Sequence, residues 1–199
     1  MPTTPQHRYF IAFALEGAAK AKVTRLRNEI SKKFDLHAAL KTPPHITLKY
    51  PFDTDNIEPV IQALTTFTKN LKPFPFTLKN FNHFDDRVWY VDVNANPKHR
   101  PLQNRIIKLV YKALSLPPEP HDQYRTPHVT LAYKDLTAEK FALVEKFLAN
   151  KSINLKIRFN NISILKLVNN KWRIYRKFKM EHLPAFPNSA SPGRGQRRS

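Results

Sequence analysis

Apolar residues along the chain follow two patterns, one typical of strands and one typical of helices. Short runs rich in aromatic and branched residues predict strands, and they lie at 9–15, 45–50, 74–81, 88–93, 128–133, 153–167 and 172–178. Apolar residues at helical spacing occur in the segments 19–34, 57–67, 102–113 and 141–148. The order of these elements predicts an α+β protein with antiparallel sheets and helices outside them.

Turn-forming residues separate several of these segments. Asp85-Asp86 predicts a turn between two strands, and Asn169-Asn170 predicts the tight turn of a closing hairpin. From Leu183 onward Pro, Ser, Gly and Arg dominate, which predicts a disordered basic tail over 183–199. We therefore expect a single domain over residues 1–182.

The pattern of elements repeats when the chain is shifted by 83 residues, the distance from His45 to His128. Strand, helix, strand, helix and strand occur in the same order over about 8–82 and about 87–165, and a closing strand follows at 171–179. Such a repeat is typical of one structural unit used twice. We expect a bilobal, duplicated fold in which the sheets face a central cleft.

One short motif recurs at the same place in both halves: TPPHITL at 42–48 and TPHVTL at 126–131. Residues i and i+2 of a strand point to the same face. His45 and Thr47 therefore share one face, as do His128 and Thr130, while the apolar residues between them turn inward. A lone histidine on a strand is more often structural, but a repeated pair favours a site.

Two histidines facing each other across a cleft suit displacement at phosphorus. A neutral imidazole can take a proton from the nucleophile while a protonated one gives a proton to the leaving oxygen. Hydroxyls such as those of Thr47 and Thr130 can donate hydrogen bonds to non-bridging phosphate oxygens. We expect neither a metal nor another cofactor, since two histidines without nearby carboxylates make a poor zinc site.

Charge indicates the kind of partner. The chain of 199 residues carries 34 Lys and Arg against 15 Asp and Glu, a formal net charge of +19. Subtracting the three arginines after His182 leaves +16 in the preceding part. Such a surplus favours a polyanion such as RNA, although a solvated basic surface would look the same. The absence of cysteine excludes disulfides and thiolate nucleophiles and fits a cytoplasmic protein, and no segment predicts a membrane span.

Over roughly Arg8–Phe178 the sequence resembles the two-histidine (2H) phosphoesterase superfamily, whose signature is a pair of His-x-Thr-x motifs in duplicated lobes. It is most similar to the group of 2′-5′ RNA ligases and RNA 2′,3′-cyclic phosphodiesterases. The opening strand RYFIA and the strand RVWYV that begins the second half also resemble that group. The resemblance implies His45 as general acid toward the leaving ribose oxygen and His128 as base for water. It also implies a substrate RNA ending in a 2′,3′-cyclic phosphate, such as one derived from tRNA. We expect the protein to be a monomer.

Further side chains are candidates for substrate contact. Lys49 has the parity of His45 and Thr47, and Phe10, Tyr50 and Tyr133 could stack a base. Four basic residues of the last strand alternate with apolar ones and could track an RNA backbone, or keep an edge soluble: Lys171, Arg173, Lys177 and Lys179.

Two departures from the group bear on the substrate. The group often has Phe-Leu-Gly after the first motif's lysine, where this chain has Tyr50-Pro51-Phe52. It often has arginine where this chain has Tyr133. Two other functions therefore remain open: a phosphodiesterase for a small cyclic phosphate such as ADP-ribose 1″,2″-cyclic phosphate, and an RNA-binding module without turnover.

Overall fold

The computed structural model describes residues 7–117, 119–122 and 126–180, so the predicted tail at 183–199 lies outside the described residues. Its strands are β1 (Arg8–Ala14), β2 (His45–Asp53), β3 (Phe74–Phe84), β4 (Val88–Asn94), β5 (His128–Tyr133), β6 (Asn154–Phe159), β7 (Asn161–Val168) and β8 (Lys171–Lys179). Its helices are α1 (Gly17–Phe34), α2 (Glu58–Lys69), α3 (His99–Leu114) and α4 (Ala138–Ala149), with short 3-10 helices η1 (Ala38–Lys41) and η2 (Pro120–Asp122).

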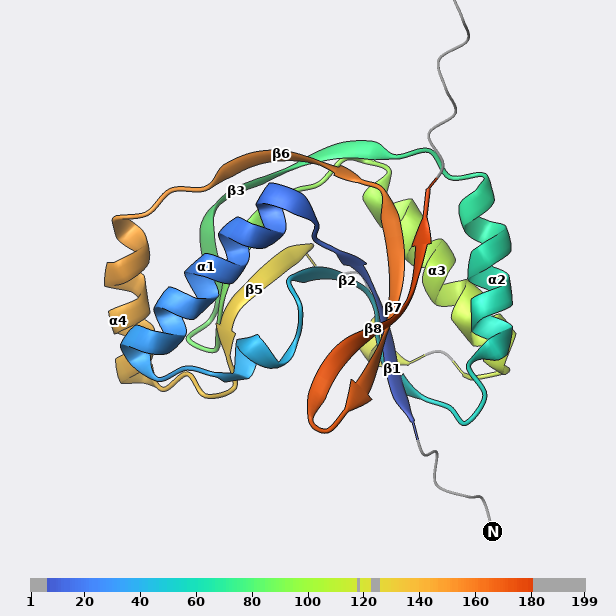
Figure 1. The fold of residues 1–199 in the computed structure, drawn as a ribbon, viewed down its shortest axis with the longest axis horizontal. Helices are drawn as coiled ribbons and strands as arrows, with labels where there is room; N and C mark the ends of the chain where they lie inside the picture. The colour runs from blue at the N-terminus through green and yellow to red at the C-terminus, as the bar shows by residue number, and fades with distance from the viewer. Residues whose placement is uncertain (1–6, 118, 123–125, 181–199) are drawn as a thin grey trace, which may run out of the picture.

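The strands form two four-stranded antiparallel sheets, in the orders β2-β1-β7-β8 and β5-β4-β3-β6. Helices α2 and α3 lie beside the first sheet, and α1 and α4 beside the second (Figure 1). The two halves therefore build two equivalent sheets, with β2-β1-β7 matching β5-β4-β3. This arrangement confirms the α+β fold with antiparallel sheets.

The prediction of one strand over 153–167 is wrong, because the chain changes sheet at Asn160. Strand β6 pairs with β3 in the second sheet, whereas β7 pairs with β1 in the first. Just past the break, the buried Asn161 side chain accepts a hydrogen bond from Ala14 N (3.2 Å) and donates one to Ala14 O (3.0 Å). Both strands bury apolar residues, so the hydrophobic pattern of the sequence continues across Asn160 and does not indicate that the chain changes sheet there.

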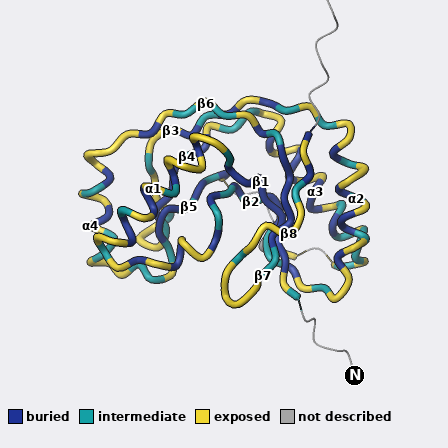
Figure 2. Tube along the Cα trace, in the orientation of Figure 1, coloured by how far each residue is buried: buried dark blue, intermediate teal, exposed yellow. Residues whose placement is uncertain are grey.

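The core joins the two sheets at this crossing. The ring of Phe159, which is fully buried, stacks on Phe13 of the first sheet at 4.7 Å and on Phe74 of the second at 4.9 Å. Figure 2 shows the buried positions running along the central strands, while the outer faces of the helices are exposed. One continuous core therefore fixes the two sheets relative to each other.

The predicted turns are confirmed by the backbone. Asn169 and Asn170 have φ of 48° and 58°, and they connect β7 to β8. This left-handed pair is the geometry that tight hairpins need and that asparagine tolerates. Asp85, at φ 47°, turns the chain from β3 to β4.

Candidate active site

The two motif histidines stand at the first positions of β2 and β5, the strands that come together where the sheets meet. Nδ1 of His45 lies 2.8 Å from Pro43 O, and Nδ1 of His128 lies 2.9 Å from Thr126 O. A carbonyl oxygen can only accept, so both Nδ1 atoms carry hydrogen. Nε2 is then the nitrogen of each ring that exchanges protons with a substrate.

Aromatic rings hold both imidazoles in place. The ring of Phe10 in β1 lies 5.0 Å from that of His45. In the other sheet, the rings of Phe84 and Tyr90 lie 4.9 and 5.2 Å from that of His128. Because β1 and β4 are equivalent strands beside the two motif strands, each histidine has the same kind of support.

A pocket of about 520 Å³ brings the motif residues of both halves together. Seven of the eight residues predicted for the site line it: Phe10, His45, Thr47, Tyr50, His128, Thr130 and Tyr133. One imidazole and one hydroxyl from each sheet therefore face the same space. This arrangement places two imidazoles that can exchange protons and two hydroxyl donors around one cavity.

Lys49 is the exception, and the prediction that it reaches the cleft is wrong. The pairing of β1 with β2 shifts register near Lys49, so the alternation of the strand breaks there. Its side chain is fully buried, and Nζ lies 2.7 Å from a carboxylate oxygen of Asp122. Tyr50 takes the place in the pocket that simple alternation gave to Lys49.

Asp122 holds this irregular part of β2. Besides the ion pair with Lys49, its carboxylate accepts hydrogen bonds from Tyr50 N (3.3 Å) and from the Tyr111 hydroxyl. Burial and the hydrogen bond to Asp122 raise the pKa of Tyr111 to about 12, so the phenol remains a donor. Lys49 therefore has a structural role, since it compensates a buried carboxylate.

The basic face predicted for the last strand is also divided. The pairing of β7 with β8 shifts register in mid-strand, so the residues at its two ends do not form one row. Lys177 forms an ion pair with Glu16, whereas Lys171 and Arg173 lie beside Trp172, which lines the pocket.

Arg27 is a residue of the site that the sequence analysis missed. Its side chain is buried and lines the pocket. Nε donates to Thr130 O (2.8 Å), and Nη1 donates to Thr42 O (2.8 Å) and Ala39 O (3.2 Å). The guanidinium thus bonds the second motif to the segment before the first. The signal in the sequence was an arginine within the apolar stripe of a helix, four residues after Val23 and three before Ile30.

The electrostatics of the pocket favour an anion. Burial, together with electrostatic repulsion from Arg27 and the neighbouring His128, lowers the pKa of His45 to about 3, so this ring is neutral at pH 7. Burial also lowers the pKa of Arg27 to about 10, which leaves the guanidinium charged. A bound phosphate would relieve this excess of positive charge and raise the pKa of His45.

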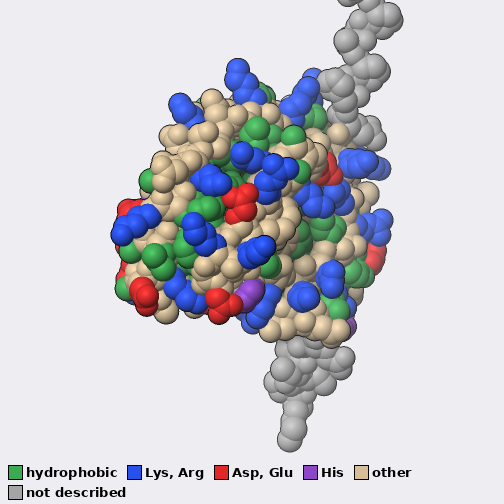
Figure 3. Space-filling view, turned by 60° about the vertical axis from the view of Figure 1, so that its left-hand side comes forward, with side chains coloured by type: hydrophobic (Ala, Val, Ile, Leu, Met, Phe, Trp, Pro, Cys, Tyr) green, Lys and Arg blue, Asp and Glu red, His purple; other side chains and the backbone are tan. Residues whose placement is uncertain are grey.

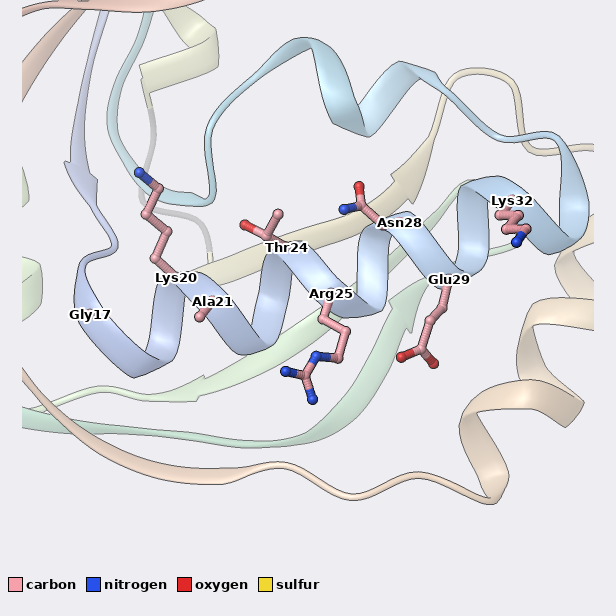
Figure 4. Close-up of a pocket in the computed structure, with 8 residues that line it drawn as sticks. All are labelled: Gly17, Lys20, Ala21, Thr24, Arg25, Asn28, Glu29 and Lys32. Atoms are coloured by element: carbon pink, nitrogen blue, oxygen red, sulfur yellow. The ribbon is translucent and has the colours of Figure 1, made fainter.

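Another hollow lies along the exposed face of α1 (Figure 4). It is lined by residues of this one helix, among them Lys20, Thr24, Arg25 and Glu29, and by no histidine or strand residue. The motif chemistry therefore belongs to the pocket between the sheets. In the described part of the chain no three His, Asp or Glu side chains cluster as metal ligands would, and no helix could span a membrane.

Comparison with solved structures supports the fold described above. The structure matches that of TT0787 from Thermus thermophilus with a TM-score of 0.60 at 17% identity, covering 87% of this chain and 97% of that one. It matches E. coli LigT, crystallised with 3′-AMP, with a TM-score of 0.59 at 13% identity, covering 88% of this chain and 99% of that one. These similarities define the fold.

Sequence similarity defines the family. The profile of the 2′-5′ RNA ligase superfamily matches residues 15–171, and the chain belongs to this superfamily. A protein of Bacillus pumilus named "Putative phosphoesterase" is 29% identical over 163 residues, which cover 79% of this chain and 90% of the relative. A Geobacillus kaustophilus protein of the same description is 26% identical over 162 residues, covering 79% and 89%. Membership supports an enzyme that acts on phosphodiesters.

Proposed function

We propose that this protein hydrolyses the 2′,3′-cyclic phosphate at the 3′ end of RNA to a 2′-phosphate, without a metal. The observation that carries the proposal is the matched pair of histidines, each with Nδ1 bound to a backbone carbonyl and each facing one shared pocket. In-line displacement at phosphorus needs a proton acceptor and a proton donor on opposite sides, and this pair supplies both.

In the proposed reaction, His128 Nε2 accepts a proton from water as the water oxygen bonds to phosphorus. The bond from phosphorus to the ribose O3′ breaks, and His45, which takes up a proton at Nε2 when the phosphate binds and raises its pKa, gives that proton to O3′. The product carries a 2′-phosphate and a free 3′-hydroxyl. If a 5′-hydroxyl of a second RNA replaces water, the same steps form a 2′-5′ phosphodiester, and their reversal cleaves it.

Three groups hold the phosphate in this scheme. Thr47 and Thr130 donate hydrogen bonds to the non-bridging oxygens, where negative charge is held during the reaction. Arg27 adds a fixed positive charge at the same pocket. It can therefore supply the charge of the arginine that the group often has at the position of Tyr133. E. coli LigT, which has the same fold, has been crystallised with phosphate as well as with 3′-AMP, which supports a nucleotide phosphate as ligand.

The test is turnover of a short RNA ending in a 2′,3′-cyclic phosphate, with EDTA present. We expect His45→Ala and His128→Ala to lower kcat by roughly 10²–10⁴-fold, the loss typical of a general acid or base. His83→Ala, which removes an exposed histidine outside the pocket, is the matched control and should retain activity. ³¹P NMR of the product should show a 2′-phosphate.

Other outcomes would select the other functions. Tight RNA binding without turnover in the wild type would identify an RNA-binding module and overturn the proposal. Faster turnover of ADP-ribose 1″,2″-cyclic phosphate than of RNA would identify an enzyme for small cyclic phosphates. Activity that EDTA abolishes and zinc restores would replace the two-histidine scheme by a metal-dependent one.

A further inference from the structure

A groove leaves the catalytic pocket and passes around the side chain of Trp172. The pocket shares Tyr133, Lys134, Leu167, Asn170 and Trp172 with a second hollow of about 280 Å³, which extends to η1. A third hollow, of about 320 Å³, shares Trp172 and Lys41 with the second and continues along the start of β8. The three hollows thus form one path between η1 and the β7–β8 hairpin, which we call the hairpin groove.

Four exposed cations line the hairpin groove: Lys41, Lys134, Lys171 and Arg173. Within the described residues, none of these four has a carboxylate at ion-pair distance. Lys177, farther along β8, is instead paired with Glu16. The acidic side chain that lines the groove, Asp135, already accepts hydrogen bonds from His37 N (2.6 Å) and Ala38 N (2.8 Å). The groove therefore carries an excess of positive charge, four cations against one carboxylate.

Position, rather than charge alone, distinguishes this groove. Lys and Arg side chains are spread over the face formed by α1 and α4 as well (Figure 3), so a basic patch by itself selects no site. The hairpin groove is continuous with the pocket that holds both histidines, and Trp172 offers an aromatic ring at the junction. This ring is held edge-on by Phe10 at 4.6 Å, next to His45.

We propose that the hairpin groove binds the backbone of an RNA strand on the 5′ side of the reacting nucleotide. The inference rests on the proposed function and narrows its substrate to a strand of several nucleotides, rather than a mononucleotide. Cationic side chains track the phosphates, and Trp172 stacks a base, the combination by which proteins bind single strands. A 2′,3′-cyclic phosphate ends its strand, so the remaining nucleotides must leave the pocket by one path, and this groove is such a path.

The test compares two substrates and two triple variants. The substrates are 2′,3′-cyclic AMP and a labelled pentanucleotide that ends in the same cyclic phosphate. The groove variant, Lys41→Gln/Lys171→Gln/Arg173→Gln, spares Lys134 because that residue also lines the catalytic pocket. The control variant, Lys146→Gln/Lys156→Gln/Arg158→Gln, removes the same charge from exposed positions of α4 and β6.

We expect the groove variant to lower kcat/KM for the pentanucleotide about 10–100-fold. Its kcat/KM for 2′,3′-cyclic AMP should stay within about twofold of the wild-type value. The control variant should change neither value. The groove variant should also flatten the salt dependence of pentanucleotide kcat/KM, because each lost phosphate contact lowers the log–log slope by about 0.7 for a single strand. Equal losses in both triple variants would show an effect of net charge and overturn the proposal. So would an equal loss for both substrates.

A binding measurement separates this inference from the proposed function. Fluorescence anisotropy of a pentanucleotide ending in a 3′-phosphate, which needs no turnover, should show weaker binding to the groove variant than to the wild type and the control. If neither substrate is turned over but this difference is found, the proposed function fails and the groove stands. If both substrates are turned over and binding does not differ, the groove fails alone.

Discussion

His45 and His128 each donate a hydrogen bond from Nδ1 to a backbone carbonyl. The pocket also strongly lowers the pKa of His45. Its low pKa in the free protein, about 3, means that a proton needed for catalysis must enter with the substrate or be drawn in by it. A phosphodiester next to the ring favours the protonated form. Which histidine is the acid and which the base can therefore be determined from the pH dependence of activity in a variant that retains only His45.

We predict the pH dependence of the residual kcat/KM of His128→Ala, a variant that lacks one of the two titrating histidines of the pocket. With His45 as the acid, kcat/KM should fall about tenfold per pH unit from pH 4.5 to 7.5, since the protonated fraction of a group with pKa about 3 falls at that rate. The measurement is kcat/KM for 2′,3′-cyclic AMP in buffers of constant ionic strength. A flat profile over this range would make His45 the base.

Lys49 gives a second prediction at the residue scale. Lys49→Met leaves the Asp122 carboxylate buried without its counter-ion, and removing one partner of a buried pair typically costs about 3–5 kcal/mol. We expect the free energy of unfolding in urea to fall by about that amount. The double variant Lys49→Met/Asp122→Asn should lose less than the sum of the two single losses. Equal stability of Lys49→Met and wild type would show that the ion pair is not a structural element.

At the scale of elements, Arg27 bonds to segments on both sides of the cleft. Arg27→Met removes the hydrogen bonds to Thr130 O, Thr42 O and Ala39 O, and a buried acceptor that loses its donor costs about 1–3 kcal/mol. We expect a loss of about 2–5 kcal/mol in stability and a fall in kcat/KM of at least tenfold. Arg27→Lys keeps the charge but not the planar set of donors. Compared with Arg27→Met, its KM should therefore return closer to the wild-type value than its stability does. Unaltered kinetics in Arg27→Met would exclude a role in the site.

The sequence predicts elements well where one local pattern decides them. Helical spacing located α1 to α4, the asparagine pair located the hairpin, and the duplicated motif located four residues of the pocket, His45, Thr47, His128 and Thr130. It fails where a single residue changes the parity or the partner of a strand. The register shift near Lys49 and the change of sheet at Asn160 leave the apolar pattern intact. Arg27 was missed because its partners are backbone carbonyls distant in the sequence.

At the scale of the whole molecule, burial of histidine couples stability to pH. His99, at the start of α3, is 3% exposed, and neither ring nitrogen has a hydrogen-bond partner among the described residues. Burial lowers its pKa to about 4, from 6.5 in an unstructured chain. Between these values the unfolded chain binds more protons than the folded one, so stability is full above pH 6.5 and is lost as the pH falls toward 4.

We therefore predict that acid destabilises the wild type more than His99→Leu. From pH 7.5 to 4.5 the shift of His99 accounts for a loss of about 2–3 kcal/mol in the free energy of unfolding, which the leucine variant should not show. Urea unfolding at both pH values measures the difference. Phe159→Leu, beside His99 at a ring distance of 6.3 Å, is the control, because it alters packing without a titrating group and should lower stability equally at both pH values. If wild type and His99→Leu lose the same free energy in acid, the pKa of His99 is the same in the folded and unfolded chains, and the acid sensitivity of the molecule lies with His45 and the pocket between its sheets.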